Sequence, residues 1–166
     1  MTRPDVDLDA TLDRMVEGLR AFSARKPVMI GIHTGGVWIA EQLHKRLGVS
    51  EPLGSLDISF YRDDFTRVGV NPQVKASNLP INVDGRHVIL VDDVLHTGRT
   101  IRAALNEIFD YGRPASVALA VLIERDGREL PIEAQVVGTR MKLAKHQHVK
   151  LLGPGKLALD VMEAGA

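Results

Sequence analysis

The sequence predicts an α/β fold in which a mostly parallel central sheet is flanked by helices. Three observations support this prediction. Short apolar runs alternate along the chain with segments whose apolar residues recur at helical spacing. The run Ser116–Ile123 is apolar at odd and even positions alike, as expected for a parallel strand covered on both faces. A glycine-containing loop also separates two of the apolar runs from the helical segment that follows each of them.

Composition narrows the class of protein. A chain of 166 residues with 45% hydrophobic and 25% charged residues suits one globular domain, here expected to span residues 1–166. Lysine plus arginine and aspartate plus glutamate both number 21, so net charge does not indicate a nucleic-acid or membrane partner. The chain has no cysteine, no apolar leader among its first residues and no run of membrane-spanning length. We therefore expect a cytoplasmic protein.

The first part of the chain predicts a helix, a strand and a second helix. The first helix is expected to be capped by Asp7 or Asp9 and ended by Pro27. A strand follows at 28–32, and after the loop "HTGG" a helical period resumes over 37–47. The apolar residues that place the first helix on one face of the sheet are Leu8, Leu12, Met15, Val16 and Leu19.

A one-sided strand and a long loop come next. The stretch "SLDISFYR", residues 55–62, alternates apolar and polar residues, which is typical of a strand with one face in water. Residues 63–80 show no sustained period and collect glycine, asparagine, proline and serine. Because such long loops are uncommon in compact domains, we expect a flexible loop at about 62–80 that acts as a lid.

The second half continues the alternation. A strand is expected at 87–91, followed by a helix over 101–108 that ends by Gly112. After the central strand already described, two short strands are expected at 133–139 and 148–153.

The stretch "VILVDDVLHTGRT" carries the clearest chemical signal. Asp92 and Asp93 follow four apolar residues, at the carboxyl end of a strand, where open α/β sheets bind ligands. Thr97–Thr100 then form the turn into a helix, whose free amides and dipole favour a phosphate. Carboxylates beside such a turn can accept hydrogen bonds from sugar hydroxyls or help to hold magnesium. Helix capping needs only one small polar residue, so the pattern favours a site for a phosphorylated sugar.

This stretch resembles the phosphoribosyl pyrophosphate (PRPP) motif of type I phosphoribosyltransferases. The segments "LDISFYRDDF" and "GRPASVALAVLIERDGRELPIEA" are similar, within that family, to pyrimidine operon regulators that also act as uracil phosphoribosyltransferases. The similarity extends from about Asp7 to Asp160. It implies the type I phosphoribosyltransferase fold, with a flexible loop, a small hood and assembly into a homo-oligomer, a dimer or higher.

The resemblance also implies roles for individual residues. Asp92 and Asp93 would bond the ribose hydroxyls, the second loop would wrap the 5′-phosphate, and "HTGG" would face pyrophosphate through its backbone amides. Family members often carry a basic residue at the position of Gly35, so one charge is missing there. The implied binding residues, besides the two acids, are His33, Thr34, Gly35, Gly36, Leu95, His96, Thr97, Gly98, Arg99 and Thr100.

The implied reaction is uracil plus PRPP giving UMP and pyrophosphate. The flexible loop would close over PRPP and exclude water, and Arg62 and Lys75 would contact pyrophosphate, so both join Asp92 and Asp93 as candidate catalytic residues. Mg²⁺ would bridge pyrophosphate and ribose hydroxyls without a direct protein ligand. Val121–Glu129 would contact the pyrimidine, largely through main-chain groups.

The resemblance names the operon's leader RNA as a further partner, with Arg14 and Arg128 as candidate contacts. Glu17, Gly127 and Glu133 stand where such regulators carry histidine or basic residues. Because phosphate binding depends on positive charge, and Glu133 would repel phosphates, we expect RNA binding of the familiar kind to be lost or weak. The alternative to an enzyme is a nucleotide-sensing regulator that binds RNA or protein with little or no catalysis.

Other interpretations of the motifs are weaker. A receiver domain would need its acid pair on the first strand, and a Walker B strand would need a P-loop, which "GPGKL" is not. His146 and His148 have the spacing of two ligands on one strand face, but no third ligand follows at metal-site spacing. We therefore expect a surface pair of histidines and no protein-only metal site.

Overall fold

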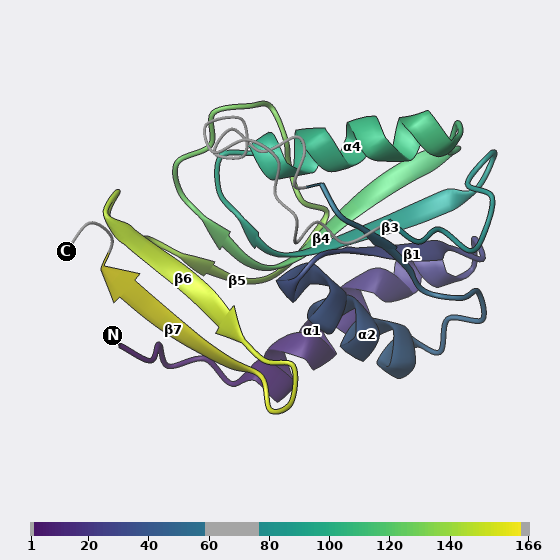
Figure 1. The fold of residues 1–166 in the computed structure, drawn as a ribbon. Coiled ribbons are helices and arrows are strands. Elements are labelled where there is room, and N and C mark those ends of the chain that lie inside the picture. Colours follow the sequence, from purple (N-terminus) through teal and green to yellow (C-terminus); the bar gives the residue numbers. More distant parts are fainter. Residues whose placement is uncertain (1, 59–76, 164–166) are drawn as a thin grey trace.

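The computed structural model describes residues 2–58 and 77–163. Its centre is a five-stranded sheet in the order β2-β1-β3-β4-β5, and all four pairings are parallel. Figure 1 shows α1 and α2 on one face of this sheet and α4 on the other. The predicted α/β class with a parallel sheet is therefore confirmed. The elements are α1 Leu8–Ser23, β1 Val28–Ile32, α2 Gly35–Leu47, β2 Gly54–Leu56, β3 His87–Leu95, α4 Arg99–Tyr111, β4 Ser116–Arg125 and β5 Val136–Met141.

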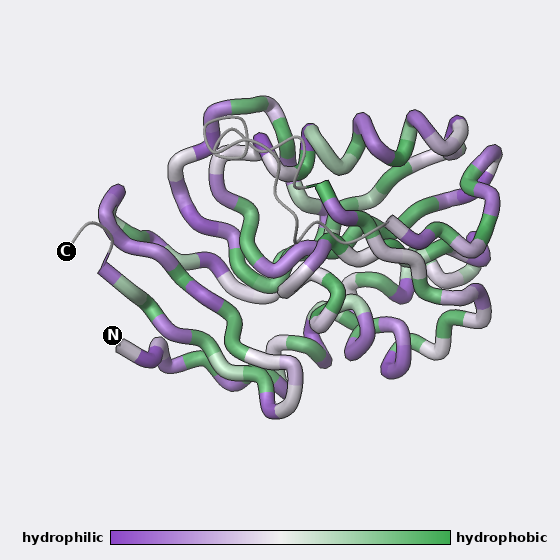
Figure 2. The backbone as a smooth tube through the Cα atoms, viewed as in Figure 1, coloured by the Kyte–Doolittle hydropathy of each residue, from purple (hydrophilic) through white to green (hydrophobic). Residues whose placement is uncertain are grey.

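The middle parts of the central strands β3 and β4 are apolar at successive positions because each face of the sheet has its own core. In β3, Ile89 and Val91 pack in the cluster that includes α1 and α2, whereas Val88 and Leu90 pack in the cluster that includes α4. This alternation follows the two-residue period of a strand. Figure 2 shows the resulting concentration of hydrophobic residues along the middle of the sheet.

A separate hairpin completes the described structure. It consists of β6 (Gln147–Leu152) and β7 (Ala158–Glu163), which pair antiparallel. The N-terminal segment runs beside β7, where Thr2 and Val161 form an isolated bridge (Figure 1). The strand expected at 148–153 is confirmed as β6, whereas β7 was not predicted.

Several predicted boundaries were wrong. The strand expected at 55–62 is Gly54–Leu56, because Asp57 and Ile58 already lie outside it, and 59–62 lie outside the described residues. The strand expected at 87–91 continues to Leu95, so the acid pair lies within β3 and not after it. The neighbouring β4 explains the extension, since it continues to Arg125 and pairs with β3 as far as Leu95↔Glu124.

Helix α1 illustrates a local prediction that succeeds at one end. The side chain of Asp7 accepts a hydrogen bond from the Ala10 amide (3.1 Å), which confirms the predicted cap. The helix ends at Ser23, four residues before Pro27. The predicted lid falls on residues outside the described ranges, apart from 77–80. No described helix combines the length and apolar character needed to span a membrane.

Candidate active site at the carboxyl edge of the sheet

The acid pair is held rigidly near the end of β3. Asp92 is 5% exposed and Asp93 is partly exposed. The Asp93 amide donates to Asp92 Oδ1 (2.8 Å), and the Val94 amide donates to Asp93 Oδ1 (2.8 Å). Each carboxylate is therefore oriented by the backbone of the following residue.

The loop after β1 packs directly against these carboxylates. A Cβ atom at Gly36 would lie 2.7 Å from the carbonyl oxygen of Val91 and 3.1 Å from Asp92 Oδ1. A Cβ atom at Gly35 would overlap the carboxyl group of Asp93. Two segments that are distant in sequence, "HTGG" and "VDD", thus meet in one place. The same contact explains why this backbone has no room for a side chain at Gly35.

The loop after β3 leads into an uncapped helix. Leu95 is buried at the strand end, and Gly98 occupies the N-cap position of α4 with a φ of 95°. The N-cap supplies no side-chain hydrogen bond, and the first turn of α4 has no acidic residue. The Thr97 hydroxyl accepts from the Arg99 amide (3.2 Å). Since the first amides of a helix have no intrahelical acceptor, this turn is suited to an anion.

The segment after β4 supports this loop from behind. The Glu129 and Leu130 amides both donate to the carbonyl oxygen of Thr97, at 2.9 and 3.0 Å. Arg99 Nε lies 2.8 Å from Glu129 Oε1, and a Cβ at Gly98 would lie 3.1 Å from Ile132. The predicted pyrimidine segment is therefore in contact with the predicted phosphate loop.

Arg128 ties the two segments together. Its Nη1 donates to the carbonyl oxygen of His96 (2.8 Å), its Nε to that of Ile132 (2.9 Å) and its Nη2 to Glu124 Oε1 (2.7 Å). Arg14, the other candidate RNA contact, donates to the carbonyl oxygen of Gly138 (3.1 Å). Both arginines are engaged within the chain, a role that sequence reasoning missed. The spacing of Glu124 and Arg128, four residues apart, was the available signal.

A cavity of about 490 Å³ opens beside this network, at the carboxyl ends of β4 and β5. The β5 residues at this cavity were not among the predicted site residues. Arg125, which is 4% exposed, fixes the neighbouring segment by donating to the carbonyl oxygens of Gln147 (2.6 Å) and Ala144 (3.2 Å). The cavity is lined by Glu124, Arg125, Asp126, Gly127, Arg128, Arg140, Met141 and Lys142.

His96 and Glu124 are among the ionisable groups at this edge whose pKa values are shifted. Burial lowers the pKa of His96, and the positive charge of Arg125 lowers it further. The hydrogen bond from Arg128 has the largest effect on the pKa of Glu124 and lowers it. Burial opposes this with a smaller rise, and the hydrogen bond from Arg140 lowers the pKa further. At neutral pH the imidazole is uncharged and the carboxylate is charged.

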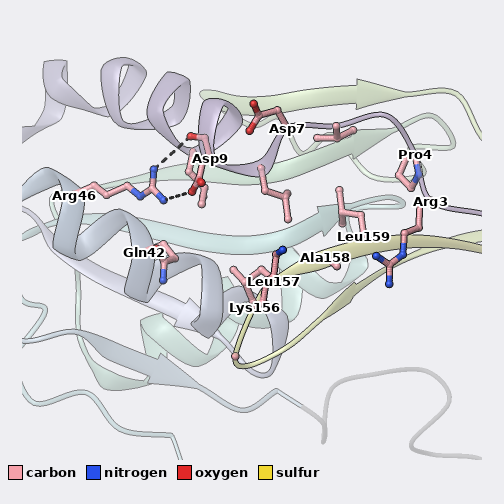
Figure 3. Close-up of a pocket in the computed structure, with 14 residues that line it drawn as sticks. Arg3, Pro4, Asp7, Asp9, Gln42, Arg46, Lys156, Leu157, Ala158 and Leu159 are labelled. Atoms are coloured by element: carbon pink, nitrogen blue, oxygen red, sulfur yellow. Dashed lines mark hydrogen bonds and ion pairs between the residues drawn. The ribbon is translucent and has the colours of Figure 1, made fainter.

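A second cavity, of about 510 Å³, lies between the N-terminal segment, α1, α2 and the turn of the hairpin (Figure 3). Its arginines are balanced by acids. Arg46 pairs with Asp9 and Asp13, each at 2.8 Å, and Arg3 Nε lies 3.4 Å from Asp160 Oδ1. This cavity contains none of the predicted site residues.

Other predicted residues lie apart from this edge or beyond description. Arg62 and Lys75 fall outside the described residues. His146 Nε2 lies 2.7 Å from Glu163 Oε2, in the hairpin region. Residues 2–58 and 77–163 contain no cluster of three or more histidine or acidic residues arranged to hold a metal.

Comparison with known proteins places the chain in a family. A model of the phosphoribosyl transferase domain matches residues 11–151. The chain is 59% identical to the bifunctional protein PyrR of Nitrosococcus oceani over 94% of this chain and 92% of that protein. It is also 59% identical to bifunctional protein PyrR of Pseudomonas paraeruginosa over 90% of each chain.

Solved structures agree on the fold. A hypoxanthine-guanine-xanthine phosphoribosyltransferase superimposes with a TM-score of 0.62 at 22% identity, covering 86% of this chain and 80% of the other. A purine phosphoribosyltransferase from Pyrococcus horikoshii superimposes with a TM-score of 0.60 at 24% identity, covering 81% of this chain and 82% of the other. The chain therefore belongs to the phosphoribosyltransferase family and, within it, to the bifunctional PyrR proteins.

Proposed function

We propose that the chain transfers the phosphoribosyl group of PRPP to uracil, forming UMP and pyrophosphate, and that it regulates pyrimidine biosynthesis. The observation that carries the proposal is the meeting of three features at one sheet edge. These are the oriented pair Asp92 and Asp93, the glycine loop packed on them, and the uncapped start of α4.

Each feature has a role in holding PRPP. The carboxylates of Asp92 and Asp93 accept hydrogen bonds from the ribose hydroxyls. The amides at the start of α4 and the hydroxyls of Thr97 and Thr100 bind the 5′-phosphate, favoured by the helix dipole. Backbone amides of residues 34–36 bind the departing pyrophosphate, because the His33 amide already donates to the carbonyl oxygen of Leu56 (2.9 Å). We assign Arg62 and Lys75 to pyrophosphate as well, on the resemblance to the family.

The cavity beside Glu124 and Arg140 is the proposed place for uracil. It adjoins the phosphate loop through Gly127, whose Cβ position is 2.8 Å from His96 Nε2. A base bound there would lie next to the sugar held by the acid pair. Binding of both reactants in one orientation converts a bimolecular reaction into a step within one complex.

The reaction needs electrostatic stabilisation more than a nucleophile. As the bond from the sugar to pyrophosphate breaks ahead of attack by uracil, positive charge develops on the ribose ring. Asp92 and Asp93 lie on the sugar side of the site and stabilise that charge. Their rigid hydrogen-bonded orientation keeps them in place before the reaction begins.

Magnesium fits the donor set at this edge. Mg²⁺ is commonly held by one or two carboxylates together with substrate phosphates, and here two adjacent carboxylates border the phosphate loop. A bound Mg²⁺ would supply positive charge that offsets the charge of pyrophosphate. Asp92 and Asp93 are the residues that would help to hold it together with PRPP.

The experiment is a UMP assay with uracil and PRPP. We expect wild type to form UMP, and Asp93→Asn to lower kcat/KM on the order of 100-fold or more because a charge facing the ribose is removed. Asp5→Asn, the same chemical change at an exposed residue of the N-terminal segment, is the control and leaves kcat/KM unchanged. A wild type that makes no UMP, or an Asp93→Asn variant with full activity, would contradict the proposal.

A further inference from the structure

One carboxylate joins the two halves of the site. Glu124 lies near the end of β4, in register with Leu95 of β3 on one side and Arg140 of β5 on the other. Its Oε1 accepts from Arg128 Nη2 (2.7 Å) and its Oε2 accepts from Arg140 Nε (2.8 Å). With a side chain only 17% exposed, it is the shared partner of two arginines that serve different parts of the site.

The first arginine serves the phosphate loop. Besides Glu124, Arg128 donates to the carbonyl oxygen of His96, which begins that loop, and to that of Ile132, which packs under Gly98. All three kinds of guanidinium nitrogen are thus engaged, and the side chain is 25% exposed. Such a fork fixes the distance between the loop and the end of β4, which a single-point cation could not do.

The second arginine serves the base cavity. Arg140 lines the cavity, and its side chain is 74% exposed. Its Nε donates to Glu124, while its terminal nitrogens have no further hydrogen-bond partner within the described ranges. An anchored guanidinium with open donors beside a cavity is suited to the carbonyl oxygen of a nucleobase.

Charge makes the carboxylate necessary. The cavity lining includes four cations, Arg125, Arg128, Arg140 and Lys142. Without Glu124, Arg128 and Arg140 would repel each other across the ends of β4 and β5, and both would lose a charge-assisted hydrogen bond. Nothing in the sequence motif of the phosphate loop indicates this dependence.

We propose that Glu124 is a positioning residue that orients Arg128 behind the phosphate loop and Arg140 at the base cavity, and thereby couples PRPP binding to nucleobase binding. This inference rests on the proposed function, because it assigns those two places to PRPP and to uracil. It predicts a pattern across three variants that a general loss of folding would not produce.

The experiment compares steady-state constants for uracil and PRPP in three variants. Arg128→Lys keeps the charge but loses the fork, so we expect the KM for PRPP to rise on the order of tenfold with the KM for uracil little changed. Arg140→Met removes the donors at the cavity and raises the KM for uracil by a similar factor, with PRPP little changed. Glu124→Gln raises both, and kcat stays within about threefold because the reacting atoms are untouched.

The matched control is Glu17→Gln, the same change in an exposed ion pair with Arg20 on α1, which leaves both constants unchanged. The double variant Glu124→Gln with Arg128→Lys should raise the KM for PRPP by about the same factor as either single change, because Glu124 and Arg128 act as a unit. The proposal is overturned if Glu124→Gln alters only one KM or neither, if it lowers kcat at constant KM, or if the double variant shows multiplied effects.

Two further readouts separate the possible failures. If Glu124→Gln does not fold, as judged by thermal melting, Arg128→Lys and Arg140→Met test the proposal without it. The proposal is contradicted if either of these variants changes the KM for PRPP and the KM for uracil equally. If wild type makes no UMP, the proposed function fails, but titration calorimetry with PRPP needs no turnover. Weaker PRPP binding by Glu124→Gln than by wild type then supports the coupling to the phosphate loop, and equal or undetectable binding contradicts it.

Discussion

Helices α1 and α4 begin in opposite ways. At α1, Asp7 caps the first turn and Asp9 adds a negative charge, both of which stabilise a helix start. At α4, the N-cap is Gly98, without a capping side chain and without an acid in the first turn. The start of α1 borders the cavity in Figure 3, whereas the start of α4 lies at the carboxyl edge of the sheet beside the acid pair.

The difference separates a helix start that is stabilised by its own cap from one that we propose binds a phosphate. An N-cap side chain contributes about 0.5–2 kcal/mol of stability, and α4 has no such side chain at its N-cap. Helix α2 also begins at the carboxyl edge and also lacks a side-chain cap at Thr34. The two helices at the site thus lack the N-cap side-chain bond that stabilises the start of α1, and the Arg99 amide of α4 donates to the Thr97 hydroxyl.

The largest effect is expected from giving α4 the cap that it lacks. Gly98→Asp would place a negative charge at the start of α4, where we propose that the 5′-phosphate binds, and like-charge contact costs several kcal/mol. We expect PRPP affinity, measured by titration calorimetry, to fall on the order of 100-fold below that of Gly98→Ala. The alanine variant also adds a Cβ at this positive φ and against Ile132, so the comparison isolates the carboxylate. Equal affinities of the two variants would contradict the assignment of the phosphate.

A second comparison sets Arg128 against Arg46, which are equally exposed at 25%. Arg128 bonds two backbone carbonyls and a largely buried carboxylate, whereas the acids paired with Arg46 are 88% and 73% exposed. Arg128→Met should cost about 2–3 kcal/mol of unfolding free energy, and Arg46→Met less than about 1 kcal/mol. Urea denaturation gives both values. Similar losses would show that the two networks are equivalent.

The packing of the glycine loop predicts a smaller loss. Gly36→Ala would place a methyl group 2.7 Å from the backbone oxygen of Val91, and overpacking of this kind costs about 1–3 kcal/mol. The activity in the UMP assay should fall with it, because the acid pair must move. At Gly155, beside the other cavity, an added Cβ meets nothing within 4 Å, so Gly155→Ala should leave stability and activity unchanged. Unchanged stability and activity of Gly36→Ala would contradict the close approach of Gly36 to the backbone of Val91.

Removing the cap of α1 tests the other side of the comparison. Asp7→Ala should lower the unfolding free energy by about 1 kcal/mol and leave PRPP affinity unchanged, since its partner is the amide of Ala10. Urea denaturation of wild type and variant measures the unfolding free energy, and titration calorimetry measures the PRPP affinity. A change in PRPP affinity would mean that α1 is linked to the site after all.

The smallest effect concerns pH. The pKa of His96 is lower in the folded protein than the usual imidazole pKa of about 6.5. Below that pH the unfolded chain therefore binds more protons at this residue than the folded protein does. Stability from this group is therefore complete above that pH and decreases as pH falls toward the lower folded pKa. Urea denaturation at pH 7.5 and pH 5.5 should show a smaller loss on acidification for His96→Gln than for wild type. An unchanged loss would exclude His96 as a source of the pH dependence.

Local features of this site could be predicted from the sequence, and contacts between strands could not. Asp92, Asp93 and the loop at Thr97–Thr100 form one continuous stretch, so their chemistry is visible without the fold. The role of Glu124 depends on Arg140, sixteen residues away on the neighbouring strand, which only the register β4–β5 brings near. The continuation of β3 through the acid pair likewise depends on the length of its neighbour β4.

The hairpin shows the same limit. Apolar residues in β6 are frequent enough to predict a strand, but β7 mixes acidic and apolar residues and is held by pairing with β6 and a bridge to Thr2. Predictions for the flexible loop, including Arg62 and Lys75, stay predictions because those residues lie outside the described ranges.

A crystal structure with PRPP and Mg²⁺ bound would decide where the sugar phosphate lies. We predict the 5′-phosphate within hydrogen-bonding distance of the amides of residues 97–100, and the ribose hydroxyls on Asp92 and Asp93. A phosphate held instead by Arg3 and Lys156 in the cavity of Figure 3, with the start of α4 empty, would contradict this assignment.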